Sequence, residues 1–459
     1  MYIKAASVYA VATTAVIKTP RFIAVLIALL LIPYLYLYAA QLWKNIAWLP
    51  LGDDYAFHVY FALVERGDPA ALFTSPGEYP GVIHLIGFLT GDPVALGRIY
   101  AVYGALLIAA GVVLYALFFK ALGASLPQAL AASAAAVVGS VRTLAGIVDG
   151  QIADKTVLLV LVPTSLYLYA KGRQTTALLV AGASLFTNFL GVAYAGALAA
   201  FQALFGTRKA KIALALLLAA GLVLTVHKFL TILTITSQFQ ASPGFNWSPL
   251  WGLIYGFYGP SPLLLIPLAA YYLPKARKAR PLLATALVVV AASLISQAYG
   301  ERLVRVASIL VPAAVAASAI ELGHRRVLLL ALAAYLAGPA AAGWAWAAGH
   351  LPALFAPVER ITPQKLAAYH AILSQLPPNA SVEIMWSLDL WVLPLAKAYR
   401  PDLNITITLC NWTRAQYYIY TPPDPAQWYL PCIANAPPPP GAPLAKYGET
   451  ALYLAKHGG

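Results

Sequence analysis

Charge is the scarcest property of this sequence. Only 10% of its 459 residues are charged, whereas 61% are hydrophobic, and the mean hydropathy is +0.74. A soluble globular protein carries roughly a quarter charged residues, so this deficit excludes a chain whose whole surface faces water. Apolar runs of about 18 to 22 residues recur between short charged loops, and each is long enough to cross a bilayer. They must cross it as helices, because lipid cannot satisfy free backbone amides.

A contiguous basic face is also missing, although the net charge is +14. Nucleic-acid binding would need such a face, so we predict no nucleic-acid partner. Instead the basic residues form short clusters that recur every two apolar runs, and the loops between these clusters hold most of the acids. This alternation is the positive-inside pattern of a multi-pass protein. The clusters are Lys171/Arg173, Arg208/Lys209/Lys211, Lys275/Arg277/Lys278/Arg280 and Arg325/Arg326.

The charge pattern predicts a polytopic α-helical protein of the cell membrane with about eleven transmembrane helices, its N-terminus in the cytoplasm and its C-terminus outside. Residues 22–43 are too long for a signal-peptide core and no small-residue cleavage site follows, so they are the first span. A transmembrane part (1–349) with a long first external loop (44–96) precedes an extracytoplasmic domain (350–459). The remaining predicted spans are 97–119, 126–141, 156–170, 175–188, 190–205, 211–231, 250–273, 282–299, 303–321 and 327–348.

The C-terminal segment has the pattern of a small α/β domain. Thr362-Pro363 starts a helix, and LDLWVLPLAKAYR is predicted as a second one. The segments SVEIMW, NITITLC, YYIYT and ETALYLAK are typical of strands. The two cysteines of the chain, Cys410 and Cys432, both lie in this segment and form either one disulfide or two free thiols. An alanine-rich composition poor in cysteine and methionine, with many prolines in loops, fits a thermophilic prokaryote such as an archaeon.

The first external loop is the best candidate for chemistry. Asp53 and Asp54 follow the first span, and on a helix Asp54, His58 and Glu65 would share one face. A carboxylate here could act as a general base, and a carboxylate–histidine cluster could hold Mg²⁺ or Mn²⁺ against phosphate oxygens. The alternative is a solvated loop whose aspartates cap a helix. The same loop also carries Tyr79 and His84 as candidate donor or acceptor contacts.

A second acidic point lies in the loop IVDGQIADKT, which contains Asp149 and Asp154. If this loop meets the first one, carboxylates from both could share a metal ion or flank a reacting group. The alternative is an aspartate turn followed by an Asp154–Lys155 surface pair.

Two arginines mark a third point, in the segment YGERLVRVASILVP. Arg302 and Arg305 are three residues apart at the mouth of a span, where guanidinium groups could bind a lipid phosphate or pyrophosphate bidentately. The alternative is that both side chains snorkel to lipid headgroups. Lys228, at the outer end of its span, is a weaker candidate for the same role.

All three points fall at external junctions of loops and helices. A polyprenyl-phosphate-linked sugar has its lipid in the bilayer and its sugar and phosphate at this interface. Acids for the acceptor or a metal, arginines for the phosphate and helices for the lipid therefore suit such a donor.

The motif GDDYAFH in the first external loop, continued by EYPGVIHL, resembles the GT-C superfamily of membrane glycosyltransferases. The Asp149/Asp154 loop and GERLVRVASILVP are similar to features of the archaeal and bacterial oligosaccharyltransferase catalytic subunit. The resemblance covers roughly residues 20–325. It implies that Asp53 or Asp54 is catalytic or metal-binding, that Asp149 or Asp154 binds metal, and that Arg302 or Arg305 binds the donor.

The sequence differs from the oligosaccharyltransferase subunit in ways that narrow its expected function. The tail has no WWDYG signature, and residues 386–389 read WSLD instead. We therefore expect a hexosyltransferase-type enzyme that moves one sugar from a polyprenyl- or dolichyl-phosphate donor, such enzymes often working without metal, with Asp53 or Asp54 as the base. The acceptor, whether glycan, lipid or protein, stays open. The alternatives are oligosaccharyltransferase-like transfer of a lipid-linked glycan, a transporter or flippase, and a non-catalytic subunit of surface-glycan assembly.

Overall fold

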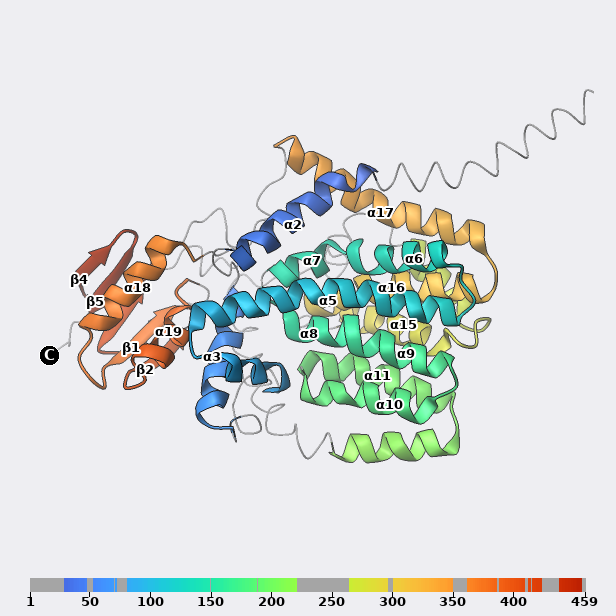
Figure 1. The fold of residues 1–459 in the computed structure, drawn as a ribbon, viewed down its shortest axis with the longest axis horizontal. Helices are drawn as coiled ribbons and strands as arrows, with labels where there is room; N and C mark the ends of the chain where they lie inside the picture. The colour runs from blue at the N-terminus through green and yellow to red at the C-terminus, as the bar shows by residue number, and fades with distance from the viewer. Residues whose placement is uncertain are drawn as a thin grey trace, which may run out of the picture.

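The structure is a computed structural model of the chain. It describes residues 29–47, 53–69, 71, 81–148, 150–187, 189–220, 264–295, 300–349, 361–385, 388–408, 412–413, 415–422 and 437–455. The described chain forms a helical bundle and, beside one end of it, a small sheet with two helices (Figure 1).

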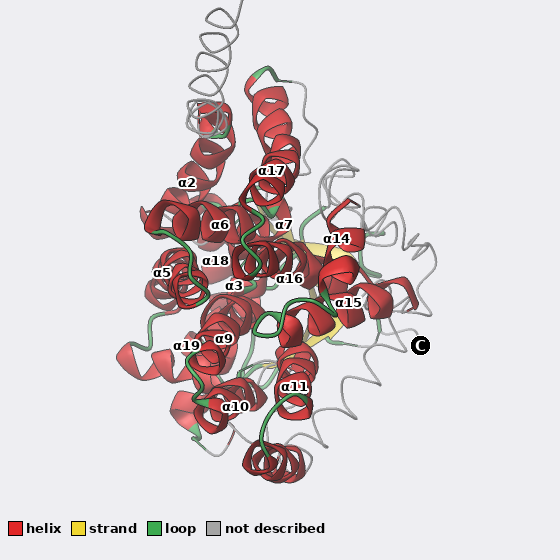
Figure 2. Cartoon of the chain, turned by 90° about the vertical axis from the view of Figure 1, so that its right-hand side faces the viewer, coloured by secondary structure: helices red, strands yellow, loops and turns green. Residues whose placement is uncertain are grey.

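Three of the described helical segments are long and apolar enough to cross a membrane: α5 (Pro93–Ala121), the segment Ile152–Ala170, and α17 (Arg325–Ala347). Viewed along the long axis of the molecule, several of the bundle helices are seen nearly end-on, so these run roughly parallel (Figure 2). The other bundle helices are α2 (Ile32–Ala47), α6 (Leu126–Val138), α10 (Gln174–Gly182), α11 (Phe189–Leu204), a helix over 208–220, α14 (Leu265–Tyr272), α15 (Arg280–Ile295) and α16 (Gly300–Glu321). The structure is therefore that of a polytopic helical membrane protein.

Several helix limits differ from the sequence-based spans. The first span was predicted over 22–43, and its described part contains α2, which runs from Ile32 to Ala47. Helix α5 begins at Pro93 because Asp92 caps it through Val94 N and Ala95 N. The span predicted over 126–141 ends at Val138. After Gly139 and Ser140 a separate short helix, α7 (Val141–Val148), begins. Residues 44–96 are also more structured than a loop, since they contain α3 (Asp53–Gly67) and the 3₁₀ helix η1 (Gly81–Leu89).

The segment after α7 combines three helix types. It starts with α8 (Ile152–Thr156), passes through a π turn, η2 (Val157–Leu161), and continues as α9 (Val162–Ala170) with Pro163 in its first turn. A π turn takes one more residue than an α turn and leaves carbonyl groups without their usual partners. Tyr115 of α5 donates to one of them, the Leu158 carbonyl, at 3.2 Å.

α16 lies inside the bundle. It packs against α6, α7, α14, α15 and α17, and its residues Val306 to Ala319 are buried. Small residues alternate with valine and leucine along it, which lets the neighbouring helices approach closely. The packing of α16 therefore also fixes the position of its first two turns, which carry Arg302 and Arg305.

Buried tyrosines join the helices to one another. Each of these phenols donates to a main-chain carbonyl of a different element, which satisfies both polar groups in an apolar interior. The described pairs include Tyr34–Val138 (3.1 Å), Tyr55–Ile147 (2.8 Å), Tyr100–Ile83 (3.2 Å), Tyr194–Asp154 (3.1 Å) and Tyr335–Ser308 (2.6 Å).

The C-terminal segment contains a five-stranded sheet in the order β2-β1-β3-β5-β4. β2, β1 and β3 are parallel, whereas β5 is antiparallel to both β3 and β4. The elements are α18 (Pro363–Gln375), β1 (Ser381–Met385), α19 (Val392–Tyr399), β2 (Asn404–Thr408), β3 (Tyr417–Tyr420), β4 (Ala442–Tyr447) and β5 (Thr450–Leu454). The sequence patterns had indicated all of these except β4. Helix α19 packs against α3, so the sheet stands at the end of the bundle where α3 lies (Figure 1).

The crossing of α2 and α17 gives a direct test of the packing. A Cβ atom on Gly343 of α17 would stand 2.5 Å from the Tyr34 nitrogen and 2.6 Å from the Tyr34 Cβ. Gly343→Ala should therefore push the helices apart and lower the free energy of unfolding by about 1–3 kcal/mol. Thermal unfolding in detergent measures the change.

Gly196→Ala is the matched control, because Gly196 is also helical but has no atom within 4 Å of an added Cβ. That variant should be as stable as the wild type or more stable by up to about 1 kcal/mol. Equal stability of Gly343→Ala and the wild type would contradict the close crossing.

Candidate active site

The candidate site begins where α7 ends inside the protein. The last carbonyls of a helix have no partner within it, and burying them unsatisfied is costly. Gln151 N donates to the Gly146 carbonyl at 2.7 Å and Gly150 N to the Ile147 carbonyl at 3.2 Å. The remaining donors come from other elements: Tyr55 OH of α3 reaches Ile147 O at 2.8 Å, and Asn45 Nδ2 of α2 reaches Val148 O at 3.0 Å.

Gly150 allows this contact to be close. Its φ of +94° lies in the region that favours glycine, and a Cβ there would stand 2.5 Å from the Tyr55 nitrogen. The turn between α7 and α8 thus lies directly on the first turn of α3. The two acidic loops singled out in the sequence are therefore in contact through Tyr55 and Gly150.

A chain of hydrogen bonds runs through the buried face of α3. Glu65 Oε1 lies 3.1 Å from His84 Nδ1, and His84 Nε2 lies 3.1 Å from His58 Nδ1. All three side chains are buried, with 2%, 0% and 0% of their surface exposed. His84 belongs to η1, so this chain also attaches η1 to α3.

The pKa of His58 lies well below its ordinary value. Burial is the largest cause, and the neighbouring His84 acts in the same direction, whereas a backbone hydrogen bond to Gly150 and the negative charge of Asp154 oppose the change. His58 is therefore neutral at physiological pH.

Asp154 and Lys155 form an ion pair, with Lys155 Nζ 2.8 Å from Asp154 Oδ2. Lys155 is fully buried, so this is not the surface pair considered as an alternative from the sequence. The Asp154 side chain keeps 17% exposure and acts electrostatically on His58. The negative charge of Asp154 on α8 therefore acts on the imidazole of His58 on α3.

Helix α16 contacts the chain just before the start of α7. Ser308 Oγ lies 2.5 Å from the Oγ of Ser140, the residue just before α7. Arg302 and Arg305 precede Ser308 on α16 by six and three residues. At about 1.5 Å per residue they lie within roughly 10 Å of Ser308 along the helix axis. The described structure gives their main chain but not their side chains.

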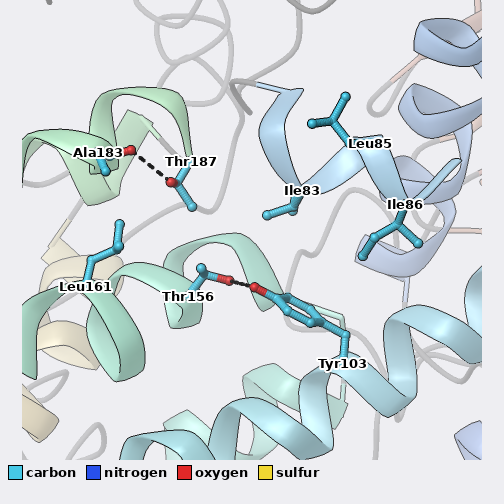
Figure 3. A pocket seen from close by; sticks show the side chains of 8 residues that line it. All are labelled: Ile83, Leu85, Ile86, Tyr103, Thr156, Leu161, Ala183 and Thr187. Carbon is cyan, nitrogen blue, oxygen red and sulfur yellow. Dashed lines mark hydrogen bonds between the residues drawn. The ribbon is translucent and has the colours of Figure 1, made fainter. Parts of the chain in front are cut away.

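An apolar cavity of about 530 Å³ adjoins this cluster, with η1 on one side and α5, α8 and η2 on the other (Figure 3). The Tyr103 phenol and the Thr156 hydroxyl, 2.8 Å apart, give it a polar floor. Thr156 is two residues from Asp154, so the cavity lies next to the charged cluster. It is lined by Ile83, Leu85, Ile86, Tyr103, Thr156, Leu161, Ala183 and Thr187, the last two from the region of the 3₁₀ helix η3 (Ala183–Phe186).

The predicted site residues fall into three groups. The structure brings Glu65, His84, His58 and Asp154 together, and Asp54 stands one turn before His58 on α3. For Asp53, Arg302 and Arg305 it gives the helix position without the side chain. Tyr79, Asp149, Lys228, Cys410 and Cys432 lie outside the described residues.

Sequence reasoning missed the residues that hold the loops together. Tyr55 and Asn45 act through main-chain carbonyls about 90 to 100 positions away, and no local pattern reports such a partner. Gly150 could have been noticed, because the Asp-Gly pair in VDGQ is typical of a turn that needs a positive φ.

The described side chains do not form a metal site. No group of three His, Cys, Asp or Glu side chains among them has the geometry to hold an ion. His58 and His84 direct a ring nitrogen at each other, and Asp154 is paired with Lys155.

Comparison with known proteins gives the fold. The structure is similar to the crystal structure of ArnT from Cupriavidus metallidurans in the apo state, with a TM-score of 0.53 and 14% sequence identity over 94% of this chain and 98% of that chain. No protein-family model and no curated relative matches the chain. The chain thus has the fold of this ArnT.

Replacing Gly150 tests the contact between the two loops. Gly150→Ala should lower the free energy of unfolding for two reasons. The positive φ should cost about 1–3 kcal/mol, and the displacement of Tyr55 should cost a further amount of about 1–3 kcal/mol. Gly123→Ala is the control, since Gly123 has a similar φ of +100° but open space around an added Cβ. Equal losses in the two variants, measured by thermal unfolding, would contradict the contact.

The buried neutral His58 makes stability depend on pH. Below about pH 6.5 the unfolded chain binds a proton at this histidine that the folded protein does not, so stability falls as the pH falls. Between pH 7.5 and 5.5 the wild type should lose stability more steeply than His58→Gln, by up to about 1.4 kcal/mol per pH unit. Denaturant unfolding across this range measures both slopes, and identical slopes would argue against a buried neutral imidazole.

Proposed function

We propose that this protein is a membrane glycosyltransferase that transfers a sugar from a polyprenyl-phosphate-linked donor to an acceptor on the extracytoplasmic side of the cell membrane. The observation that carries the proposal is the contact of α3 with the α7–α8 turn beside an apolar cavity. The reaction class is supported by the resemblance of GDDYAFH and EYPGVIHL to GT-C glycosyltransferases and by the similarity of the fold to ArnT.

The donor lipid would occupy the cavity beside η1. Its volume of about 530 Å³ is within the usual range of ligand pockets, about 300–1,000 Å³. Its walls are aliphatic, which suits the first units of a prenyl chain, and its polar floor at Tyr103 and Thr156 suits the point where the chain meets the phosphate. The cavity therefore favours a lipid-borne donor over a free nucleotide sugar.

The phosphate would be bound by Arg302 and Arg305. Both stand in the first two turns of α16, where the partial positive charge of the helix start adds to that of the guanidinium groups. Lys228 is proposed as a further cationic contact, and Glu65, Tyr79 and His84 as donor or acceptor contacts of the first loop. Neutralising the phosphate would make it a better leaving group.

The reaction would be an inverting displacement. The acceptor hydroxyl loses its proton to Asp53 or Asp54 while its oxygen attacks the anomeric carbon, and the bond from that carbon to the phosphate oxygen breaks with its electrons. The acceptor would be a glycan, a lipid or a protein group that reaches α3 from the side of the C-terminal sheet, since α19 packs against α3. A single monosaccharide remains the proposed unit of transfer.

No step of this proposal passes through a metal ion. The described groups that would ligate one are engaged with one another, as the His58–His84 contact and the Asp154–Lys155 pair illustrate. If a Mg²⁺ or Mn²⁺ ion takes part, its proposed ligands are Asp54, His58, Asp149 and Asp154. Transfer that survives EDTA would agree with the metal-free route.

Glycan analysis of a deletion strain tests the function. Without the gene, mass spectrometry should show a polyprenyl-phosphate sugar accumulating and one monosaccharide missing from a glycan. The wild type should restore both. Asp54→Asn or Asp53→Asn should lower transfer by about 10²- to 10⁴-fold in the variant that removes the base, while the protein still folds.

Asp92→Asn is the matched control. Asp92 is also an aspartate of residues 44–96, but its carboxylate caps the start of α5 by accepting from Val94 N and Ala95 N. Asparagine keeps one of these two contacts through Oδ1 and is itself a favoured N-cap residue. The variant should restore transfer fully. Full transfer in both Asp53→Asn and Asp54→Asn would overturn the assignment of the base, and unchanged glycans in the deletion strain or in Arg302→Gln/Arg305→Gln would favour a non-catalytic subunit.

A further inference from the structure

The end of the bundle away from the C-terminal sheet is strongly basic. Helix α5 begins beside the sheet, where Asp92 accepts from Tyr399 of α19 at 3.5 Å, and its other end lies roughly 43 Å away by helix rise. The connecting turns at that other end, here called the basic end, are residues 120–126, 170–174, 204–211, 272–280 and 321–326 (Figure 1). They contain Lys120, the four basic clusters of the sequence and one acidic residue, Glu321.

The Glu321 carboxylate is bound by main-chain groups of the α14–α15 loop. Its Oε1 accepts from Arg277 N and Lys278 N and its Oε2 accepts from Ala279 N, each at 2.9 Å. The carboxylate therefore fixes the loop, while the side chains of Arg277 and Lys278 stay exposed. Holding like charges in a fixed loop costs Coulomb energy, which an anion from outside the chain would offset.

Two arginines are brought into adjacent turns on one side of the basic end. Thr207 N donates to Gln174 Oε1 at 2.9 Å, which joins the turn before α10 to the turn after α11. Arg173 precedes Gln174 and Arg208 follows Thr207, and both arginine side chains are exposed. Neither forms an ion pair with a carboxylate of the described chain. Two guanidinium groups without a counter-charge therefore project from adjacent turns.

Exposed apolar side chains begin within one turn of these arginines. Leu204, at the end of α11, is 63% exposed, and Ile212, one turn after Arg208, is 54% exposed. Leu216 continues this row along the helix over 208–220, whose opposite face packs on α10 and α11. Large apolar side chains exposed on a membrane bundle face hydrocarbon. The change from leucine and isoleucine to arginine thus marks the level where acyl chains give way to lipid phosphates.

We propose that Arg173 and Arg208 bind the phosphate of an anionic phospholipid whose acyl chains lie along Leu204, Ile212 and Leu216. Guanidinium groups match phosphate oxygens in a bidentate geometry. A headgroup with net negative charge is favoured, because a zwitterionic one would bring an ammonium group to a surface that already has excess positive charge. A soluble phosphate would form the same ion pairs but would bury no hydrocarbon.

This lipid site is separate from the candidate active site. The 3₁₀ helix η3, which contributes to the apolar cavity, follows one end of α10, and Arg173 precedes the other end. Lipid binding at Arg173 and Arg208 therefore does not depend on the proposed sugar transfer.

Displacement of a fluorescently labelled phosphatidylglycerol from the full chain in non-ionic detergent measures the binding. Unlabelled phosphatidylglycerol should compete at least about 10-fold more tightly than phosphatidylcholine, and this preference should shrink between about 0.1 M and 1 M salt. Arg173→Gln/Arg208→Gln should lower the affinity for phosphatidylglycerol about 30-fold, from about fivefold for each charge near an anionic lipid. Its affinity for phosphatidylcholine should not change.

Arg325→Gln/Arg326→Gln is the matched control, because it removes the same charge from the start of α17. Helix α17 lies on the opposite side of the bundle from α10 and α11 (Figures 1 and 2). This variant should lose less than about threefold in affinity for phosphatidylglycerol, since salt screens charges at that distance. Equal losses in the two double variants would overturn the site and indicate diffuse attraction to the whole basic end.

Glycerol phosphate separates a lipid from a soluble phosphate as the ligand. It carries the phosphate without acyl chains, so it should displace the labelled lipid only at concentrations at least about 100-fold higher than phosphatidylglycerol. Displacement at similar concentrations would overturn the lipid as the ligand.

Thermal unfolding in detergent checks that the variants fold. Both arginines are exposed, so Arg173→Gln/Arg208→Gln should unfold at the wild-type temperature without added lipid. Phosphatidylglycerol should then raise the midpoint of the wild type and of the α17 control but not that of this variant. If the double variant fails to fold, Arg208→Gln alone, with an expected loss of about fivefold, takes its place. Unchanged affinity in a folded variant, or equal affinity of the wild type for both phospholipids, would overturn the proposal.

Discussion

The need to satisfy the carbonyl groups at the end of α7 sets the geometry of this protein. A helix that ends inside an apolar body leaves carbonyls that water cannot reach, and each must find a donor in the protein. Asn45 and Tyr55 supply those donors from α2 and α3, and the turn at Gly150 supplies another. One helix end thus determines where α3 stands, and with it the positions of Asp54 and His58.

The same constraint recurs through the bundle. Phenol groups of Tyr34, Tyr115, Tyr194 and Tyr335 each donate to a carbonyl on another helix. In an interior of mostly alanine, leucine and valine, dispersion forces alone specify helix positions weakly, because small side chains pack acceptably in several registers. A directional bond from a large rigid ring selects one register, which is why a chain with so little charge can still place polar groups accurately.

The sequence was a good guide to features that depend on local composition. Apolar length predicted the helices that became α5, α9 and α17, and alternation or capping signals predicted α18, β1, β2, β3 and β5. It was a poor guide to contacts between distant segments. The break before α7 lies at Ser140, which contacts Ser308 of α16. The link from His58 to His84 requires η1 to pack on α3.

The candidate site shows the same division. The acidic loops, the histidines and the arginine pair could be picked out because few ionisable groups occur in such a sequence. Their joint position could not be predicted, since it follows from Tyr55, Asn45 and Gly150, which bear no mark of function. Strand β4 was missed for a related reason. Its six residues have little apolar alternation and are held by pairing with β5.

The π turn Val157–Leu161 has a consequence for how this membrane segment can change in evolution. Relative to an uninterrupted α-helix, the extra residue rotates everything before it by about 100°. Deleting a single residue there would leave α9 seated against α5 and α10, yet it would turn Asp154 and Thr156 toward a different neighbour. The segment therefore consists of two half-helices whose rotation about the helix axis can change independently. Helix α9 packs within the bundle, and α8 carries Asp154 and Thr156.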